Sequence, residues 1–121
     1  LLEHESASGT FHWYAHEGLV WTCSMKNDLE EATQHAQLLI REGEDPERRC
    51  ENAWGHFALA RLHEKLGDRQ AAELADARAL KIVRSLEQLP TKSFWLEKIS
   101  SIYHHAHDDQ ASLDTLKMAL R

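Results

Sequence analysis

Residues 59–80 have the sequence LARLHEKLGDRQAAELADARAL, in which apolar side chains recur at steps of three and four on both sides of Gly67. That spacing is typical of amphipathic α-helices and not of strands, where apolar side chains alternate. Gly67 favours the left-handed backbone conformation that ends a helix, and Asp68 is a preferred N-cap for the next one. The stretch therefore predicts two helices joined by a tight turn.

The same kind of turn recurs 40 residues earlier, at Asn27-Asp28, and 40 residues later, at His107-Asp108. Other columns repeat at this step on both sides of the turn: Leu19, Leu59 and Ile99; Ala32, Ala72 and Ser112; and the pairs Leu39-Ile40, Ala79-Leu80 and Ala119-Leu120. A fixed period in both helices indicates one helical hairpin repeated three times. The predicted helices span residues 11–26, 28–43, 51–66, 68–88, 92–106 and 108–121, with Pro46 and Pro90 in the connections between hairpins.

We therefore predict an all-α fold in which residues 11–121 form one domain of three antiparallel hairpins, 11–50, 51–90 and 91–121. Of the 121 residues, 42% are hydrophobic, which is enough for a continuous core. Residues 1–10 are expected to be the tail of a preceding repeat or an N-terminal cap. Because no capping element follows the last hairpin, we expect a segment of a longer array, with Leu116 and Leu120 exposed and available for self-association.

The excess of acidic over basic residues argues against nucleic acid as a partner. Lys and Arg number 14 against 20 Asp and Glu, a formal charge of -6, whereas a nucleic-acid surface needs clustered Lys and Arg. The sequence has no apolar run of about 18 residues and no signal-peptide pattern, so neither a membrane span nor secretion is predicted. Its two cysteines, Cys23 and Cys50, form no CxxC pair and suit a reducing compartment. We expect a cytoplasmic protein.

The repeat resembles the tetratricopeptide repeat family. The residues that carry the resemblance are Leu59, Ala60, His63, Gly67-Asp68, Ala72 and Ala79-Leu80, and nearly as well Ile99, Ser100, Tyr103, Asp108 and Ala119-Leu120. The 40-residue unit is longer than the usual unit of about 34, which implies longer second helices, as in extended variants found in regulatory and scaffolding proteins. The sequence departs from the family pattern at Asp76, where a large apolar residue is usual, and at His16 and His56, where Trp is usual.

The resemblance implies a right-handed superhelix whose first helices line a concave groove for a peptide, tail or helix of a partner protein. It implies neither catalysis nor a cofactor. The groove positions of the family fall on Tyr14, Glu17 and Trp21 in the first hairpin, on Trp54, Phe57, Arg61 and Glu64 in the second, and on Phe94, Glu97, Ser101 and His104 in the third. The acidic members of this set favour a basic or mixed-charge partner.

The aromatic members of this set have two interpretations. Tyr14, Trp54 and Phe94 stand 40 residues apart in one column, and such rings either pack against the neighbouring hairpin, which is the favoured interpretation, or face a partner as hot-spot anchors. Trp21 has polar neighbours on its helix face and is the better candidate for an exposed ring.

The sequence has nine histidines, which raises the question of a metal site. His12 and His16 are four apart on one helix face, and His104, His105 and His107 form a second group. No HExxH and no Cys-pair motif occurs, so we predict no metal site. The histidines nevertheless support an alternative function: a sensory or regulatory repeat domain that responds to a small ligand, a metal or pH.

Enzyme motifs are absent: the sequence has no GxSxG elbow, no glycine-rich phosphate loop and no kinase signature, so no enzyme is predicted. Arg61 is either an anchor for a partner carboxylate or, as the favoured interpretation, a solvated partner of Glu64 three residues on. Cys23 falls on an inward column and is expected to be an inert buried thiol. Cys50 precedes a helix start, a position that lowers the pKa of a thiol.

Overall fold

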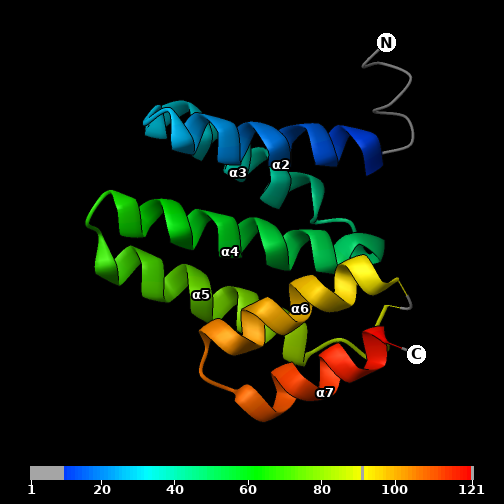
Figure 1. Cartoon of the computed structure of the whole chain (residues 1–121). Helices are drawn as coiled ribbons and strands as arrows, with labels where there is room; N and C mark the ends of the chain where they lie inside the picture. The colour runs from blue at the N-terminus through cyan, green and yellow to red at the C-terminus, as the bar shows by residue number, and fades with distance from the viewer. Residues whose placement is uncertain (1–9, 91, 121) are drawn as a thin grey trace.

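The computed structural model describes residues 10–90 and 92–120, and the side chains of residues 17–90 and 92–120. This part of the chain is helical and has no strand, so the predicted all-α class is confirmed (Figure 1). Its elements are α2 (Thr10–Met25), α3 (Leu29–Glu42), the 3-10 turn η1 (Pro46–Arg48), α4 (Arg49–Lys65), α5 (Arg69–Arg84), α6 (Ser93–His105) and α7 (Asp109–Ala119). Helices α2 and α3, α4 and α5, and α6 and α7 pair as three antiparallel hairpins (Figure 1).

All three hairpin turns have the predicted geometry. The backbone takes a positive φ at the bend, of 64° at Asn27, 79° at Gly67 and 64° at His107. The Asp that follows each bend then caps the second helix, because its carboxylate accepts a hydrogen bond from the backbone amide three residues on. The three capping bonds are Glu31 N to Asp28 Oδ1, 3.3 Å, Ala71 N to Asp68 Oδ1, 3.1 Å, and Ala111 N to Asp108 Oδ1, 3.2 Å.

The end of α5 differs from the prediction, which carried this helix to residue 88. The helix ends at Arg84 because Ser85 caps it: its backbone amide bonds to Lys81 O at 3.1 Å and its hydroxyl donates to Ile82 O at 2.8 Å. Arg49 at the start of α4 donates to Ser85 Oγ at 2.6 Å and ties the two ends together. The connection from α5 to α6 therefore begins earlier in the sequence than predicted.

The hairpins stack one on the next, with α2 and α7 at opposite ends of the stack (Figure 1). The core runs through the stack, and its largest fully buried side chains are Val20, Leu39, Leu62 and Ile99. Gly43, which follows α3, lies close to the backbone of α4: a Cβ placed on Gly43 would lie 2.5 Å from both the Cα and the N of Asn52. Glycine at this position therefore sets the distance between the first two hairpins. No helix among the described residues has the length and apolar character needed to cross a membrane.

Candidate functional site

The first helices of the three hairpins meet in a cluster that we call the Lys98 cage, formed by Glu17, Trp54, Phe94 and Lys98, of which only Phe94 is exposed. Lys98 Nζ lies 2.6 Å from Glu17 Oε1, 3.9 Å from the centre of the Trp54 ring and 4.7 Å from that of Phe94. The Trp54 indole N–H donates to the same Glu17 oxygen at 3.1 Å. The cage therefore joins α2, α4 and α6 through one ammonium group, one carboxylate and two aromatic faces.

Lys98 is mostly removed from solvent in this cage. The side chains of Lys98 and Glu17 are each only 13% exposed. Burial lowers the pKa of Lys98, and the adjacent Glu17 carboxylate opposes that effect. The sequence prediction included Glu17, Trp54 and Phe94 and missed Lys98, which stands one helical turn after Phe94 on the same face.

A second cluster surrounds Arg61 at the junction of α4, α5 and α6. The Arg61 guanidinium contacts Asp76 of α5 at 2.5 Å and Glu64 at 2.7 Å, and it lies over the Phe57 ring, 4.7 Å from its centre. His105 of α6 completes the group: its ring packs edge-on against Phe57 at 5.6 Å and its Nε2 lies 3.7 Å from Asp76 Oδ2. Asp76, which departs from the family pattern, thus has a role as the carboxylate partner of a cation.

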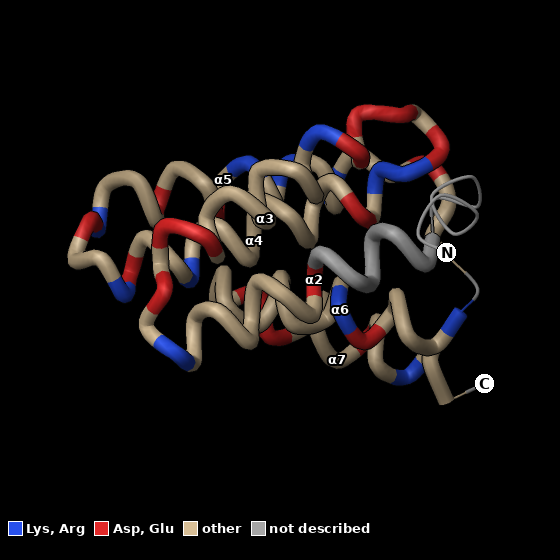
Figure 2. The backbone as a smooth tube through the Cα atoms, turned by 90° about the horizontal axis from the view of Figure 1, so that it is seen from above, with Lys and Arg blue, Asp and Glu red and all other residues tan. Residues whose placement is uncertain are grey.

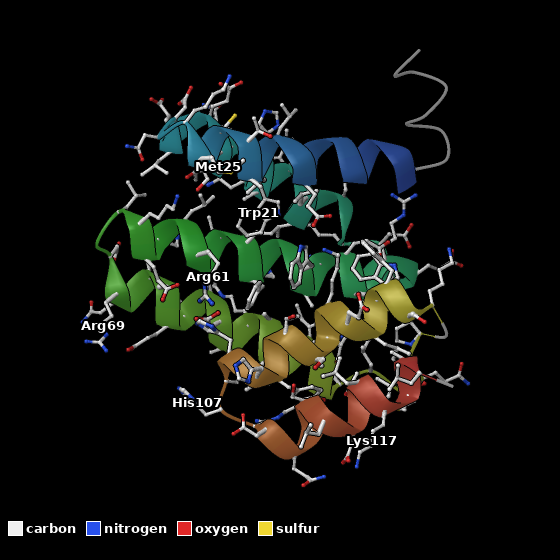
Figure 3. All side chains as sticks on the ribbon, viewed as in Figure 1. Trp21, Met25, Arg61, Arg69, His107 and Lys117 are labelled. Atoms are coloured by element: carbon white, nitrogen blue, oxygen red, sulfur yellow. The ribbon has the colours of Figure 1, made fainter. Side chains whose placement is uncertain are left out.

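The predicted Arg61–Glu64 pair forms, but the expectation that Arg61 is solvated is corrected. The Arg61 side chain is only 18% exposed, because it lies between α4 and α5 (Figure 3). Its Nη1 is buried and finds no hydrogen-bond partner among the described residues. Arg61 therefore stabilises the packing of α4 against α5 within the second hairpin and offers little to a partner carboxylate.

The aromatic residues of the predicted groove are divided between core and surface. Trp54 and Phe57 are 8% and 9% exposed and stack on each other at 4.7 Å. Burial of Trp54 agrees with the favoured interpretation, in which its ring packs against a neighbouring hairpin, and corrects its alternative role as an exposed anchor; Phe57 is likewise more buried than a groove residue was expected to be. Trp21 is half-buried against the core and is not the most accessible ring (Figure 3). Phe94, at 37% exposed, is more accessible. The side chain of Tyr14 lies outside the described residues.

Three of the remaining predicted residues lie on the third hairpin, where a groove of about 710 Å³ runs between α6 and α7. We call it the α6–α7 groove. Its lining comprises Phe57, Glu97, Ser100, Ser101, His104, His105, Asp109, Ser112, Leu113 and Leu116. Glu97, Ser101 and His104 were predicted to contact a partner, and all three are exposed here. Glu64 is 49% exposed and lies outside this lining.

Two leucines give the α6–α7 groove an apolar side. Leu116 and Leu113 are 41% and 51% exposed, and Leu120, on the same helix face one turn on, is 88% exposed. The predicted exposure of Leu116 and Leu120 is confirmed, whereas Leu113 was missed although the spacing 113, 116, 120 marks one face of a helix. Glu97, Asp109 and the two histidines supply a polar rim, with His104 Nδ1 3.5 Å from Asp109 Oδ1.

Charged residues elsewhere are mixed in sign, with acidic residues gathered at the connection between α3 and α4 (Figure 2). The described residues contain no group of three or more His, Cys, Asp and Glu side chains that would hold a metal ion. The side chains of His12 and His16 lie outside the described set. His56 is half-buried, and burial lowers its pKa.

The two cysteines are poor nucleophiles. Cys23 is 8% exposed, and burial raises its pKa, as expected for an inert thiol. Cys50 is the second residue of α4, but burial, with a smaller contribution from Glu51, raises its pKa to about 11. The expectation that the helix start lowers the pKa of Cys50 is therefore corrected: burial, which disfavours the charged thiolate, raises it.

We expect native Cys50 to react with iodoacetamide at pH 8 about 100-fold more slowly than the same thiol in urea, because its pKa is about two units above the ordinary value. Peptide mapping by mass spectrometry separates its modification from that of Cys23. The same shift predicts that the thiol's contribution to stability is complete below about pH 9 and is lost as the pH rises towards 11. Equal rates in the native and unfolded chains would contradict the burial of Cys50.

Comparisons with protein-family models, with curated proteins and with solved structures found no match to this chain. The features of the chain that bear on its function are therefore the repeat, the contacts between hairpins and the α6–α7 groove.

Proposed function

We propose that this chain is a non-catalytic protein-interaction module, similar to a tetratricopeptide array, that binds a helix of a partner protein in the α6–α7 groove. The observation that carries the proposal is the groove itself. It combines exposed leucines, Leu113 and Leu116, with an acidic and imidazole rim, in a volume suited to the side chains of one helix face. An exposed apolar groove with a polar rim is typical of a protein-binding surface.

The position of the groove within the repeat supports a helix as the occupant. The equivalent face of the first hairpin is covered by α4, and that of the second is covered in part by α6. The third hairpin has the same construction, and no other helix of the described residues covers its face. Glu97 and Asp109 at the rim favour a partner helix that carries Lys or Arg beside its apolar stripe.

The burial of Trp54, Phe57 and Arg61 moves the proposed site away from the middle of the concave face. Trp54 contacts Glu17 and Lys98 of the neighbouring hairpins, and Phe57 contacts His105 of the third. Arg61 lies over Phe57 and pairs with Asp76 of its own hairpin. A partner would have to break these contacts to reach the three side chains. A partner can reach the α6–α7 groove of the third hairpin without breaking such contacts.

Selection of amphipathic helical peptides from a random library against the immobilised chain tests the proposal. We expect the enriched peptides to be basic, and to lose affinity by at least about tenfold on the Leu116→Glu variant, because a buried carboxylate opposes docking of an apolar stripe. Leu74→Glu is the matched control: Leu74 is 54% exposed on α5, outside the groove, and its variant should bind as the wild type does.

Circular dichroism of both variants checks that they fold. If the selected peptides bind wild type and Leu116→Glu equally, the groove is not the site and the proposal is wrong. The same conclusion follows if Leu74→Glu reduces binding as much as Leu116→Glu does.

A further inference from the structure

Two junctions inside the chain join consecutive hairpins. At the first, Gly55 of α4 lies on Ile40 of α3, and a Cβ on Gly55 would be 2.9 Å from Ile40 Cγ1. Asn52, one turn earlier, donates from Nδ2 to Ile40 O at 2.8 Å. At the second, Ile99 and Ile102 of α6 are buried in the same core as side chains of α4 and α5. Each junction therefore seats the first helix of a later hairpin on the hairpin before it.

The residues through which α4 and α6 pack on the preceding hairpin lie on one face of each helix. They recur at the 40-residue step. On α4 they are Gly55, Leu59 and Leu62; on α6 they are Trp95, Ile99 and Ile102; on α2 the same positions are Ala15, Leu19 and Thr22. Ile99 is 1% exposed, whereas Leu19 is 41% exposed and Thr22 is also exposed. At Leu19 and Thr22, helix α2 thus presents a face that no other described residue covers and that α4 and α6 bury at the equivalent positions.

The second helix of each hairpin carries the surface on which the next hairpin packs, and its exposure also differs between α3 and α7. Ala36 and Ile40 of α3 lie on the face covered by α4; Ala36 is 0% exposed and Ile40 is half-buried. Their equivalents on α7 are Leu116 and Leu120, which are 41% and 88% exposed. Because α2 and α7 lie at opposite ends of the stack (Figure 1), one molecule exposes both halves of a further junction.

We infer that α2 of a second copy of this chain docks in the α6–α7 groove of the first, head to tail, as α4 docks on the first hairpin. The inference rests on the proposed function, because it names the helix that occupies the same groove. The contact would pair Leu19 of one copy with Leu116 and Leu120 of the other. The interface joins two different surfaces, so each pair of copies retains a free face at both ends, and further copies add without closing the assembly.

The charge of α2 distinguishes this occupant from a basic partner helix. Among Asp, Glu, Lys and Arg, the helix Thr10–Met25 carries only Glu17, and Glu17 is paired with Lys98 of its own chain. The interface between copies therefore forms no ion pair between Asp or Glu and Lys or Arg through α2, and its affinity is insensitive to salt. Binding of a basic helix to Glu97 and Asp109 at the rim would weaken as salt is added.

Sedimentation velocity of the full chain over a hundredfold range of concentration tests the inference with two variants. Leu19→Glu blocks docking through α2 and leaves the α6–α7 groove able to bind. Leu116→Glu blocks the α6–α7 groove and leaves α2 able to dock. We expect the wild type to form progressively larger species as concentration rises, each variant alone to remain monomeric, and an equimolar mixture of the two to form a 1:1 dimer and nothing larger. Leu74→Glu should associate as the wild type does, and salt should have little effect.

The inference is wrong if the wild type is monomeric over the whole range, if either variant still self-associates, or if the mixture forms no dimer. Circular dichroism confirms that each variant is folded before its result is used. The peptide selection distinguishes this failure from failure of the proposed function. A monomeric wild type whose selected peptides depend on Leu116 excludes the second copy as occupant but retains the groove as a site for a partner helix.

Discussion

Replacement of Trp54 by alanine is expected to lower the free energy of unfolding by about 3–5 kcal/mol, which is the usual cost of removing a large buried aromatic side chain. Trp54 is 8% exposed, stacks on Phe57 at 4.7 Å and lies under Lys98 Nζ at 3.9 Å. Its loss leaves a cavity between the hairpins and removes the indole N–H bond to Glu17. Urea unfolding followed by circular dichroism measures the change.

Trp54→Phe provides the matched variant, because it keeps an aromatic ring and removes the N–H donor. We expect a smaller loss, of about 1–2 kcal/mol, from the missing hydrogen bond and the reduced ring area. A Trp54→Ala variant within about 1 kcal/mol of the wild type would place this ring on the surface and contradict the Lys98 cage.

Gly43→Ala is expected to destabilise the chain by about 3 kcal/mol or to separate the first two hairpins, because the added Cβ would lie 2.5 Å from the backbone of Asn52. The backbone at Gly43 has φ of -80°, which alanine also adopts, so the effect comes from contact between helices and not from backbone strain. Thermal or urea unfolding measures it.

Gly18→Ala is the control for helix propensity. Nothing lies within 4 Å of a Cβ at Gly18, in the interior of α2, so alanine there should stabilise the chain by about 0.5–1 kcal/mol. If Gly43→Ala also stabilised the chain, α3 and α4 would have to lie farther apart than described.

The turns were predictable from sequence because their chemistry is local. Asn27, Gly67 and His107 all adopt positive φ, and the Asp after each accepts the predicted capping bond. The early end of α5 was not predictable in the same way. It depends on Ser85 and on Arg49 of another helix, 36 residues away, which helical periodicity does not detect.

The candidate site was only partly predictable, because its contacts depend on how the hairpins cross. Glu17, Trp54 and Phe94 were placed on the correct helices, but Lys98 has no counterpart in the repeat: the equivalent positions hold Gly18 and Ala58. Lys98 reaches from the third hairpin past the second to Glu17 of the first. A contact between the first and third hairpins that is made once is not detected by comparing positions 40 residues apart.

Burial of the groove residues was ambiguous for a related reason. Helical spacing indicates that Phe57 and Arg61 share a face with Glu64, but not that α6 covers part of that face. In the structure His105 packs against Phe57 and faces Asp76, which itself binds Arg61. Accessible surface is therefore found on the third hairpin, whose equivalent face nothing covers among the described residues.

An amide chemical-shift titration of the isotope-labelled chain with a library-selected helical peptide tests the central claim most directly. We predict that the largest shifts map to both walls of the α6–α7 groove, at residues such as Ser101, His104, Leu113 and Leu116, and that they disappear in Leu116→Glu but persist in Leu74→Glu. Shifts confined to α3, or to the face of α5 that carries Leu74, would contradict the assignment of the groove as the site that binds a partner helix.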